Sequence, residues 1–225
     1  MTRTTNARIA GSTFLIYIAA GITSMVLFRG ATRGDAIADK LASIAGQGTD
    51  VGVLVLLGFV QAFSALILGV TLWAITRDED SDLAMFGLTC RVGEGIIGGL
   101  SIPGILTVFS LSTSAGTDAA AAAAAQTLAG YLLRDDVALP ATFFAVGSTL
   151  FSWLLLRGRM IPISLAWLGV AASVLLVVCL PLIYAGFLHG PIATLMWLPM
   201  LVFEVVLALW LLTRGVAPPT RTHAA

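Results

Sequence analysis

Three ionisable side chains lie inside apolar stretches of this sequence: Arg91, Glu94 and Glu204. A charge at the centre of a lipid bilayer is costly unless it is partnered, roughly 2.5–3.5 kcal/mol for arginine. Such residues usually pair with one another and serve in proton relays, solute sites or ion-pair locks. One arginine and two glutamates carry a net charge of −1, which favours the neutral form of one carboxyl in a low-dielectric site. We expect the three groups to titrate as a coupled set, acting either as a fixed lock or as a proton-sensitive switch.

The positions of these charges predict a common depth in the membrane. Arg91 lies eight residues after Leu83, and Glu204 lies eight residues before Leu212. Both of these span ends are expected on the same side of the bilayer. At the helical rise of 1.5 Å per residue, each side chain starts ~12 Å inside that side. Equal depth would make an ion pair between Arg91 and Glu204 geometrically easy.

Small residues at helical spacing accompany the charges. Steps of three or four place these residues on one face of a helix: Gly87, Arg91, Glu94, Gly95, Gly98 and Ile102. Gly95 and Gly99 also form the Gly-x-x-x-Gly pattern, which lets membrane helices approach closely. The residues expected to pack helices are Gly87, Gly95, Gly98 and Gly99.

A comparable stripe of small residues surrounds Gln61 in the preceding apolar stretch. We therefore expect a buried polar centre, holding either ion pairs or a ligand, that is formed by Arg91, Glu94, Glu204 and Gln61.

Other chemical motifs are absent or out of context. Residues 93–98 spell Gly-x-Gly-x-x-Gly, but the dinucleotide fingerprint needs a preceding strand and a water-accessible helix start. Glycine packing is the better interpretation within an apolar helix. The sequence contains no P-loop, zinc-protease motif, nucleophile elbow or Cys-x-x-Cys pair. We expect no catalytic residue, metal or cofactor, because His189 and His223 cannot form a zinc or haem site alone and Cys90 and Cys179 act as small hydrophobes.

The composition explains where such charges can lie. The chain of 225 residues is 58% hydrophobic and 11% charged, and its mean hydropathy is +0.99. A soluble domain is about 25% charged, so this chain has too few charges to cover a water-facing surface. It is expected to be an integral membrane protein whose partner is the lipid bilayer. Its 12 basic and 12 acidic residues balance, which excludes a nucleic-acid footprint.

Six apolar runs are each about long enough to cross a bilayer as a helix. Their expected ranges are 9–28, 51–76, 83–109, 137–156, 163–187 and 192–212. The fold class is therefore an all-α polytopic bundle of six transmembrane helices. We expect residues 1–215 to form one transmembrane domain and residues 216–225, with two adjacent prolines, to form a disordered tail.

Two further segments are expected outside the spans. In residues 35–45, Ile37, Leu41 and Ile44 share one face, which predicts a short amphipathic helix on the outer surface. Residues 117–133 contain seven consecutive alanines, which favour a helix in the outer loop. The pattern leaves open whether this second segment touches the membrane.

Four short motifs carry a resemblance to a known family. They are Ala7-Arg8-Ile9-Ala10-Gly11, Arg91-Val92-x-Glu94, Leu198-Pro199 followed by Glu204, and Leu209-Trp210-Leu211-Leu212. From Arg8 to about Gly215 the chain resembles the bacterial multi-pass membrane family called domain of unknown function 4386. The resemblance implies a six-helix membrane protein and no established activity, ligand or cofactor. The alanine run departs from the family pattern and concerns the outer loop alone.

The distribution of basic residues predicts the orientation. With six spans, one side holds seven of them: Arg3, Arg8, Arg77, Arg157, Arg159, Arg214 and Arg221. The other side holds four: Arg29, Arg33, Lys40 and Arg134. We expect a bacterial plasma membrane protein with both termini in the cytoplasm.

Three functions are compatible with these features. The first is binding or transport of a small solute or of protons through the buried Arg/Glu centre, which predicts a cavity at that depth. The second is a structural or regulatory membrane protein whose charges form a static lock. The third, favoured least, is an intramembrane enzyme using Glu94 or Glu204 as a general base. The substrate or ligand and the oligomeric state are left open.

Overall fold

The computed structural model describes residues 2–114, 119–133 and 138–218 of the chain. Its helices in chain order are α1 (Arg3–Ala31), α2 (Ile37–Ala45), α3 (Gly48–Thr76), α4 (Ser81–Gly99), α5 (Ser101–Ser114), α6 (Ala119–Leu132), α7 (Ala138–Arg157), α8 (Ile163–Tyr184), α9 (Ile192–Leu195) and α10 (Trp197–Thr213). The described part of the chain contains no strand. The predicted all-α fold class is therefore confirmed.

Six helices are long and apolar enough to cross a membrane: Arg3–Ala31, Gly48–Thr76, Ser81–Ser114, Leu139–Arg157, Ile163–Tyr184 and Ile192–Thr213. Each of the six expected ranges overlaps one of them, and the expected first residue of the fourth range, residue 137, lies outside the described residues. The third of these helices is interrupted after Gly99, where α4 passes into α5. Pro103 has no N–H to donate to the Gly99 carbonyl four residues earlier, so the regular helix cannot continue through this point.

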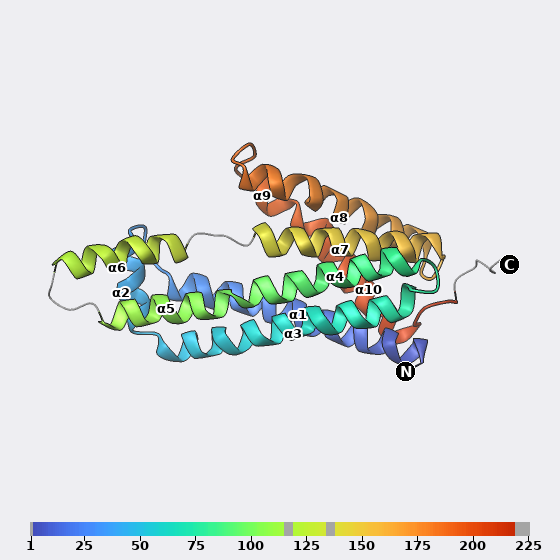
Figure 1. Cartoon of the computed structure of the whole chain (residues 1–225), viewed down its shortest axis with the longest axis horizontal. Helices are drawn as coiled ribbons and strands as arrows, with labels where there is room; N and C mark the ends of the chain where they lie inside the picture. The colour runs from blue at the N-terminus through green and yellow to red at the C-terminus, as the bar shows by residue number, and fades with distance from the viewer. Residues whose placement is uncertain (1, 115–118, 134–137, 219–225) are drawn as a thin grey trace.

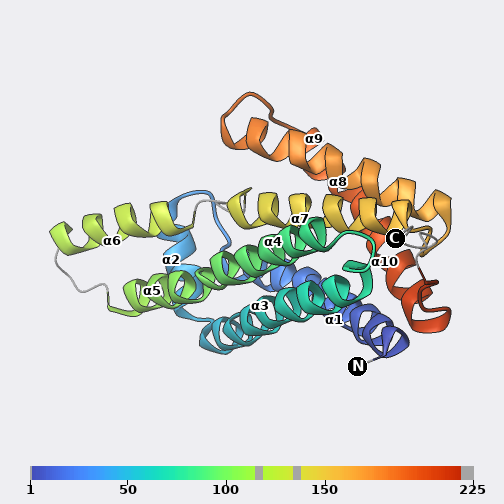
Figure 2. The same ribbon diagram turned by 45° about the vertical axis from the view of Figure 1, so that its right-hand side comes forward.

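The contacts between the six spans follow a closed ring in sequence order, and Figures 1 and 2 show the bundle from the side. Each packs against the spans before and after it, and α10 closes the ring by packing against α1 as well as α8. Short connections between successive helices favour this antiparallel order. The order has one consequence for the interior: α4 and α10 occupy opposite positions in the ring.

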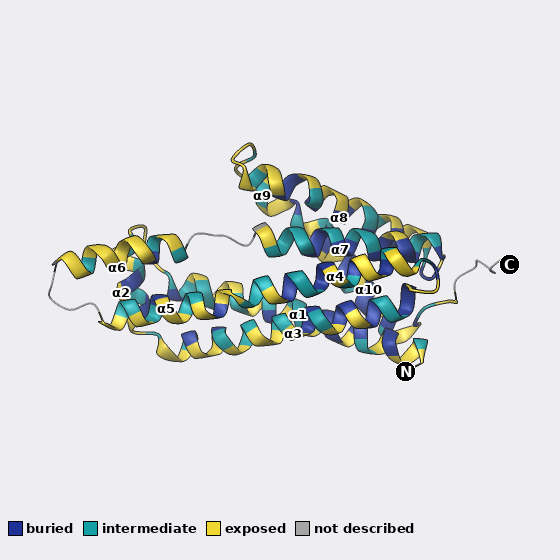
Figure 3. Cartoon of the chain, in the orientation of Figure 1, coloured by how far each residue is buried: buried dark blue, intermediate teal, exposed yellow. Residues whose placement is uncertain are grey.

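Burial separates the interior of the ring from its outer face, as Figure 3 shows. Large apolar side chains such as Phe63, Ile96 and Trp167 are exposed on the outside, as expected of helices that face lipid rather than water. The interior holds one extended hydrophobic cluster that includes Phe14, Leu68 and others.

Glycines mark the closest helix contacts. A Cβ at Gly11 would lie 2.7 Å from the Ala208 carbonyl oxygen, where α1 meets α10. A Cβ at Gly95 would lie 2.9 Å from the Ala62 carbonyl oxygen of α3, and one at Gly87 would lie 2.9 Å from the Phe151 ring of α7. The other two glycines expected to pack helices have looser contacts: a Cβ at Gly98 would lie 3.9 Å from Pro140, and one at Gly99 would lie 3.8 Å from Ala62.

The start of α1 and the end of α10 lie at one end of the bundle, together with the turns 77–80 and 158–162 (Figure 1). This end is here called the termini end. The opposite end, here called the cap end, carries α2 and α6. Helices α1 and α3 are each 29 residues long, about 43 Å, whereas the hydrocarbon core of a bilayer is about 30 Å thick. The excess length of these helices extends to the cap end, where a second small hydrophobic core packs. It is formed by Ala31, Leu41, Ile44, Val51, Val108 and Ala129.

The two segments expected outside the spans are helical. The predicted apolar face of α2 is real, since Leu41 and Ile44 are buried and α2 packs against α5 and α6. The predicted alanine-rich helix is α6, which begins at Ala119. The expected start, residue 117, lies outside the described residues. At the C-terminal end of the chain, the N–H of Ala217 donates to the Met160 carbonyl at 3.0 Å, and residues 219–225 are not described.

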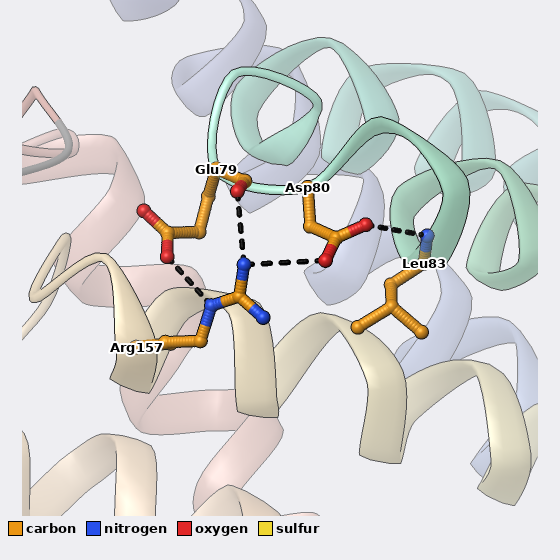
Figure 4. A network of polar contacts seen from close by, with 4 residues as sticks. All are labelled: Glu79, Asp80, Leu83 and Arg157. Atoms are coloured by element: carbon orange, nitrogen blue, oxygen red, sulfur yellow. Dashed lines mark hydrogen bonds and ion pairs between the residues drawn. The ribbon is translucent and has the colours of Figure 1, made fainter. Parts of the chain in front are cut away.

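At the termini end, Arg157 of α7 holds the turn between α3 and α4 (Figure 4). Its guanidinium donates to the Glu79 carboxylate at 2.7 Å, to the Glu79 carbonyl at 3.0 Å and to the Asp80 carboxylate at 3.2 Å. Asp80 also accepts the Leu83 N–H at 3.1 Å as the N-cap of α4. That backbone bond, followed by Arg157, holds the pKa of Asp80 below its ordinary value. The stability gained from this carboxylate is therefore present above its ordinary pKa and is lost as pH falls through the lower pKa of the folded chain.

Two glycine substitutions on α4 test this packing. We expect Gly95→Ala to destabilise the bundle by about 1–3 kcal/mol, because its methyl group meets the backbone of α3, which cannot move aside. Gly99→Ala, one helical turn away, is the matched control and is expected to be neutral or stabilising, since alanine is the better helix former. Thermal unfolding of both variants in the same detergent measures the difference. Equal stability of the two would contradict the packing described.

Candidate functional site

Helix α4 directs Arg91 and Glu94 from one face into the ring. These side chains are nearly inaccessible, with Arg91 1% and Glu94 4% exposed. The Nη1 atom of Arg91 lies 2.7 Å from Oε2 of Glu94. Because the two residues are three apart, successive turns of the same helix present them to each other.

Tyr17 of α1 supplies a second hydrogen bond to the Glu94 carboxylate. Its hydroxyl donates to Oε1 of Glu94 at 2.7 Å. Each carboxylate oxygen of Glu94 therefore accepts a short hydrogen bond, one from a charged donor on α4 and one from a neutral donor on α1. Charge-assisted bonds of this kind are the stronger class. The Glu94 carboxylate thus ties two neighbouring spans together.

Aromatic rings enclose the guanidinium of Arg91. Its carbon lies 5.1 Å from the ring centre of Phe144, 5.8 Å from that of Tyr17 and 6.0 Å from that of Phe14. Two of its nitrogens, Nε and Nη2, have no hydrogen-bond partner in the part of the chain that the structure describes. Ring faces attract cations within about 6 Å, so aromatic contacts occupy positions where polar partners would otherwise be required.

Glu204 of α10 reaches the same interior from the opposite side of the ring. It is 5% exposed, and its Oε1 atom has no hydrogen-bond partner among the described residues. Arg91 and Glu94 are near enough to act on it through their charges. Glu204 is thus the carboxyl of the centre that has an unpartnered oxygen.

The structure pairs Arg91 with Glu94 and not with Glu204. Among the ion pairs of the described residues, Arg91 joins Glu94 and none joins Glu204 within 4.0 Å. Equal depth brings the two side chains to the same level, but it does not make their helices neighbours. The positions of α4 and α10 across the ring separate them, and Glu94 lies one turn away on Arg91's own helix.

A small cavity adjoins Glu204. Its volume is about 10 Å³, and its polar lining consists of Glu204, Ser148 and Ser152. The rest of the lining is apolar and includes Phe14 and Phe151. A cavity of this size with polar walls is at the lower limit for one water molecule.

Among the described residues, the hydrogen bonds of Gln61 go to partners outside this cluster. Its amide donates to the Ser24 hydroxyl of α1 at 3.1 Å and to the Leu57 carbonyl of its own helix at 3.5 Å. The α3 residue that abuts Arg91 is Gly69, where an added Cβ would lie 3.0 Å from the Arg91 Cβ. Eight residues separate Gln61 from Gly69, which is ~12 Å along the helix. Gln61 therefore joins α1 to α3 at a distance from Arg91, whereas the next residue, Ala62, abuts α4 at Gly95, beside Glu94.

Sequence reasoning did not identify Tyr17, Phe14 or Phe144 as parts of the site. A signal was present in the first span, where Ala7, Ala10, Phe14 and Tyr17 are spaced by three or four residues, as expected of one buried face. A tyrosine at mid-membrane also needs a partner for its hydroxyl. Phe144 has no such signal, because nothing in its span distinguishes it from the phenylalanine beside it.

The residues considered for metal or redox chemistry are dispersed. Cys90 and Cys179 are both buried and free, and His189 is exposed. The described residues contain no group of three His, Cys, Asp or Glu side chains placed to hold a metal ion.

A family model described as Domain of unknown function (DUF4386) matches residues 9–215, and the chain belongs to this family. No curated protein matches the chain, and no solved structure matches it.

Removing one hydroxyl group tests the site. We expect Tyr17→Phe to lower the free energy of unfolding by about 1.5–3 kcal/mol, because the buried Glu94 carboxylate loses a donor. Tyr184→Phe is the matched control, since Tyr184 is 68% exposed, and it is expected to be neutral. Chemical unfolding in detergent compares the two variants. A Tyr17→Phe protein as stable as the control would show that the bond to Glu94 contributes nothing.

Proposed function

We propose that this DUF4386 protein, a multi-pass membrane protein with six candidate spans, takes up and releases a proton at Glu204 inside its helix ring. Arg91, Glu94 and Tyr17 form the fixed part of the centre, and Glu204 forms the exchangeable part. The observation that carries the proposal is the unpartnered Oε1 atom of Glu204 in an interior that also contains a buried arginine.

The difference between the two carboxyls supports this division. Glu94 accepts one bond from Arg91 and one from Tyr17, so its negative charge is stabilised on both oxygens. An ionised carboxylate without such partners is expensive in a low-dielectric interior. For Glu204, binding a proton neutralises the carboxylate and removes this free-energy cost.

The groups around Glu204 favour a switch between two arrangements. The titratable neighbours are Arg91 and Glu94 on α4 and Tyr17 on α1, whereas α7 faces the cavity with two serines. When Glu204 loses its proton, the unpartnered Nε and Nη2 atoms of Arg91 become its strongest available attraction. Proton release therefore draws α10 and α4 toward each other across the ring, and proton uptake relaxes them.

The size of the cavity favours a proton over a larger solute. Sites for small molecules occupy about 300–1,000 Å³, whereas the space beside Glu204 is about 10 Å³. A proton and a single water molecule are the species that fit this arrangement of the helices.

A static lock is the second candidate, and the closed triad of Arg91, Glu94 and Tyr17 favours it. Both of its contacts are 2.7 Å long, and Arg91 does not line the cavity beside Glu204. In this alternative the centre only orients helices, and Glu204 never exchanges its proton.

Infrared spectroscopy of the reconstituted protein separates the two candidates. As pH is changed, we expect the wild type to gain and lose the carbonyl band of one buried carboxylic acid, and Glu204→Gln to lack that change. Asp39→Asn, at an exposed carboxyl on α2, is the control and is expected to keep it. A wild type with no titrating buried carboxyl would support the static lock, and a change that persists in Glu204→Gln would exclude Glu204 as the proton site.

We further propose that the termini end faces the cytoplasm of a bacterial cell. The support is the larger number of Arg residues assigned to that side, seven against four Arg and Lys on the other. In whole cells, a single cysteine replacing Ser114 at the cap end is expected to react with a membrane-impermeant thiol reagent, and one replacing Asp78 is expected to stay unlabelled. The reverse result would invert the topology. Replacing Cys90 and Cys179 beforehand removes the background.

A further inference from the structure

A cavity of about 590 Å³ opens at the termini end of the bundle. Three segments contribute to it: the start of α1, the end of α3 with the turn that follows, and the chain after α10. Its lining consists of Arg3, Asn6, Val70, Ala74, Arg77, Asp78 and Pro218. None of these residues belongs to the buried centre around Arg91.

The polar part of this lining carries a net charge of +1, from two arginines and one aspartate. Arg3 pairs with Asp78 at 2.8 Å. Arg77 is 3.8 Å from the same carboxylate, which is a weak contact, and its guanidinium lies 5.0 Å from the ring centre of Trp73. Arg77 is therefore oriented by an aromatic ring, and among the described residues Asp78 is its one ion-pair partner.

The apolar part of the lining belongs to the face of a membrane span. Val70 and Ala74 lie on α3, and Val70 is 54% exposed. Val70 precedes Arg77 by two helical turns, so the cavity extends from the charged end of the span into its lipid-facing surface. A ligand that fits has an anionic group beside an apolar body.

We propose that this cavity binds the headgroup of an anionic phospholipid. Arginine guanidinium groups match the geometry of phosphate oxygens and bind them through paired N–H donors. Arg77 and Arg3 hold the phosphate, and an acyl chain lies along Val70 and Ala74. The cavity volume lies in the range of small-molecule sites and is far larger than an inorganic phosphate requires. A free ion would also make no contact with the apolar wall.

Asp78 has a distinct part in this site. Its carboxylate neutralises Arg3 when no phosphate is bound, and it repels the phosphate that would replace it. Removing the charge of Asp78 therefore strengthens lipid binding, whereas removing the charge of Arg77 weakens it. Opposite effects from adjacent residues distinguish a phosphate site from general attraction to a charged surface.

Native mass spectrometry of the full chain in detergent, with added phosphatidylglycerol or phosphatidylcholine, tests the proposal. We expect one phosphatidylglycerol to be retained per chain in preference to phosphatidylcholine. Arg77→Gln is expected to weaken its binding by roughly tenfold or more, as for the loss of a charge-assisted hydrogen bond. Asp78→Asn is expected to strengthen it, and Arg159→Gln, at an arginine outside the cavity, is expected to leave it unchanged.

Three outcomes would overturn the assignment. The first is equal retention of the two lipids by the wild type. The second is an equal loss of binding in Arg77→Gln and Arg159→Gln, which would indicate attraction to the surface charge alone. The third is displacement of phosphatidylglycerol by millimolar inorganic phosphate, which would identify a free anion as the ligand. Thermal unfolding of each variant verifies that the exposed substitutions leave the fold intact.

Discussion

The guanidinium of Arg91 has to be accommodated inside a ring of apolar helices, and much of the interior is arranged around it. At 1% exposure it has lost its hydration, so its charge must be balanced by protein groups. Glu94 supplies the opposite charge, and Tyr17 stabilises that carboxylate in turn. Aromatic rings from α1 and α7 surround the remaining sides. One buried charge therefore determines the residue types on three different spans.

The closed ring of spans determines how the remaining charge is used. Because successive spans are neighbours and α10 returns to α1, the helix that carries Glu204 lies opposite the helix that carries Arg91 and Glu94. Glu94 has a direct bond to Arg91 and Glu204 does not. Two glutamates of the same chemistry consequently differ in surroundings, one held between donors and the other facing a small cavity lined by two serines and by apolar side chains.

The charged residues at the termini end differ in their surroundings from those in the interior. Arg157 binds the turn between α3 and α4 at the rim of the bundle, where its own side chain and that of Asp80 are partly exposed and that of Glu79 is buried. Arg3 and Arg77 line an open cavity whose wall continues along the outer face of α3. The proposed proton site thus lies in the interior, and the proposed headgroup site lies at the rim.

Much of this protein could be predicted from residue order alone, because its determinants are local. The length of each apolar run predicts the six spans, the spacing of Leu41 and Ile44 predicts the buried face of α2, and the scarcity of charge makes Arg91, Glu94 and Glu204 conspicuous. The partners of those charges depend on the tertiary structure. The sequence places Arg91 and Glu204 at equal depth, yet only the order of helices around the ring makes them opposite rather than adjacent. The hydrogen bond from Tyr17 to Glu94 likewise depends on the order of the helices. Contacts between spans are decided by packing and not by spacing along the chain.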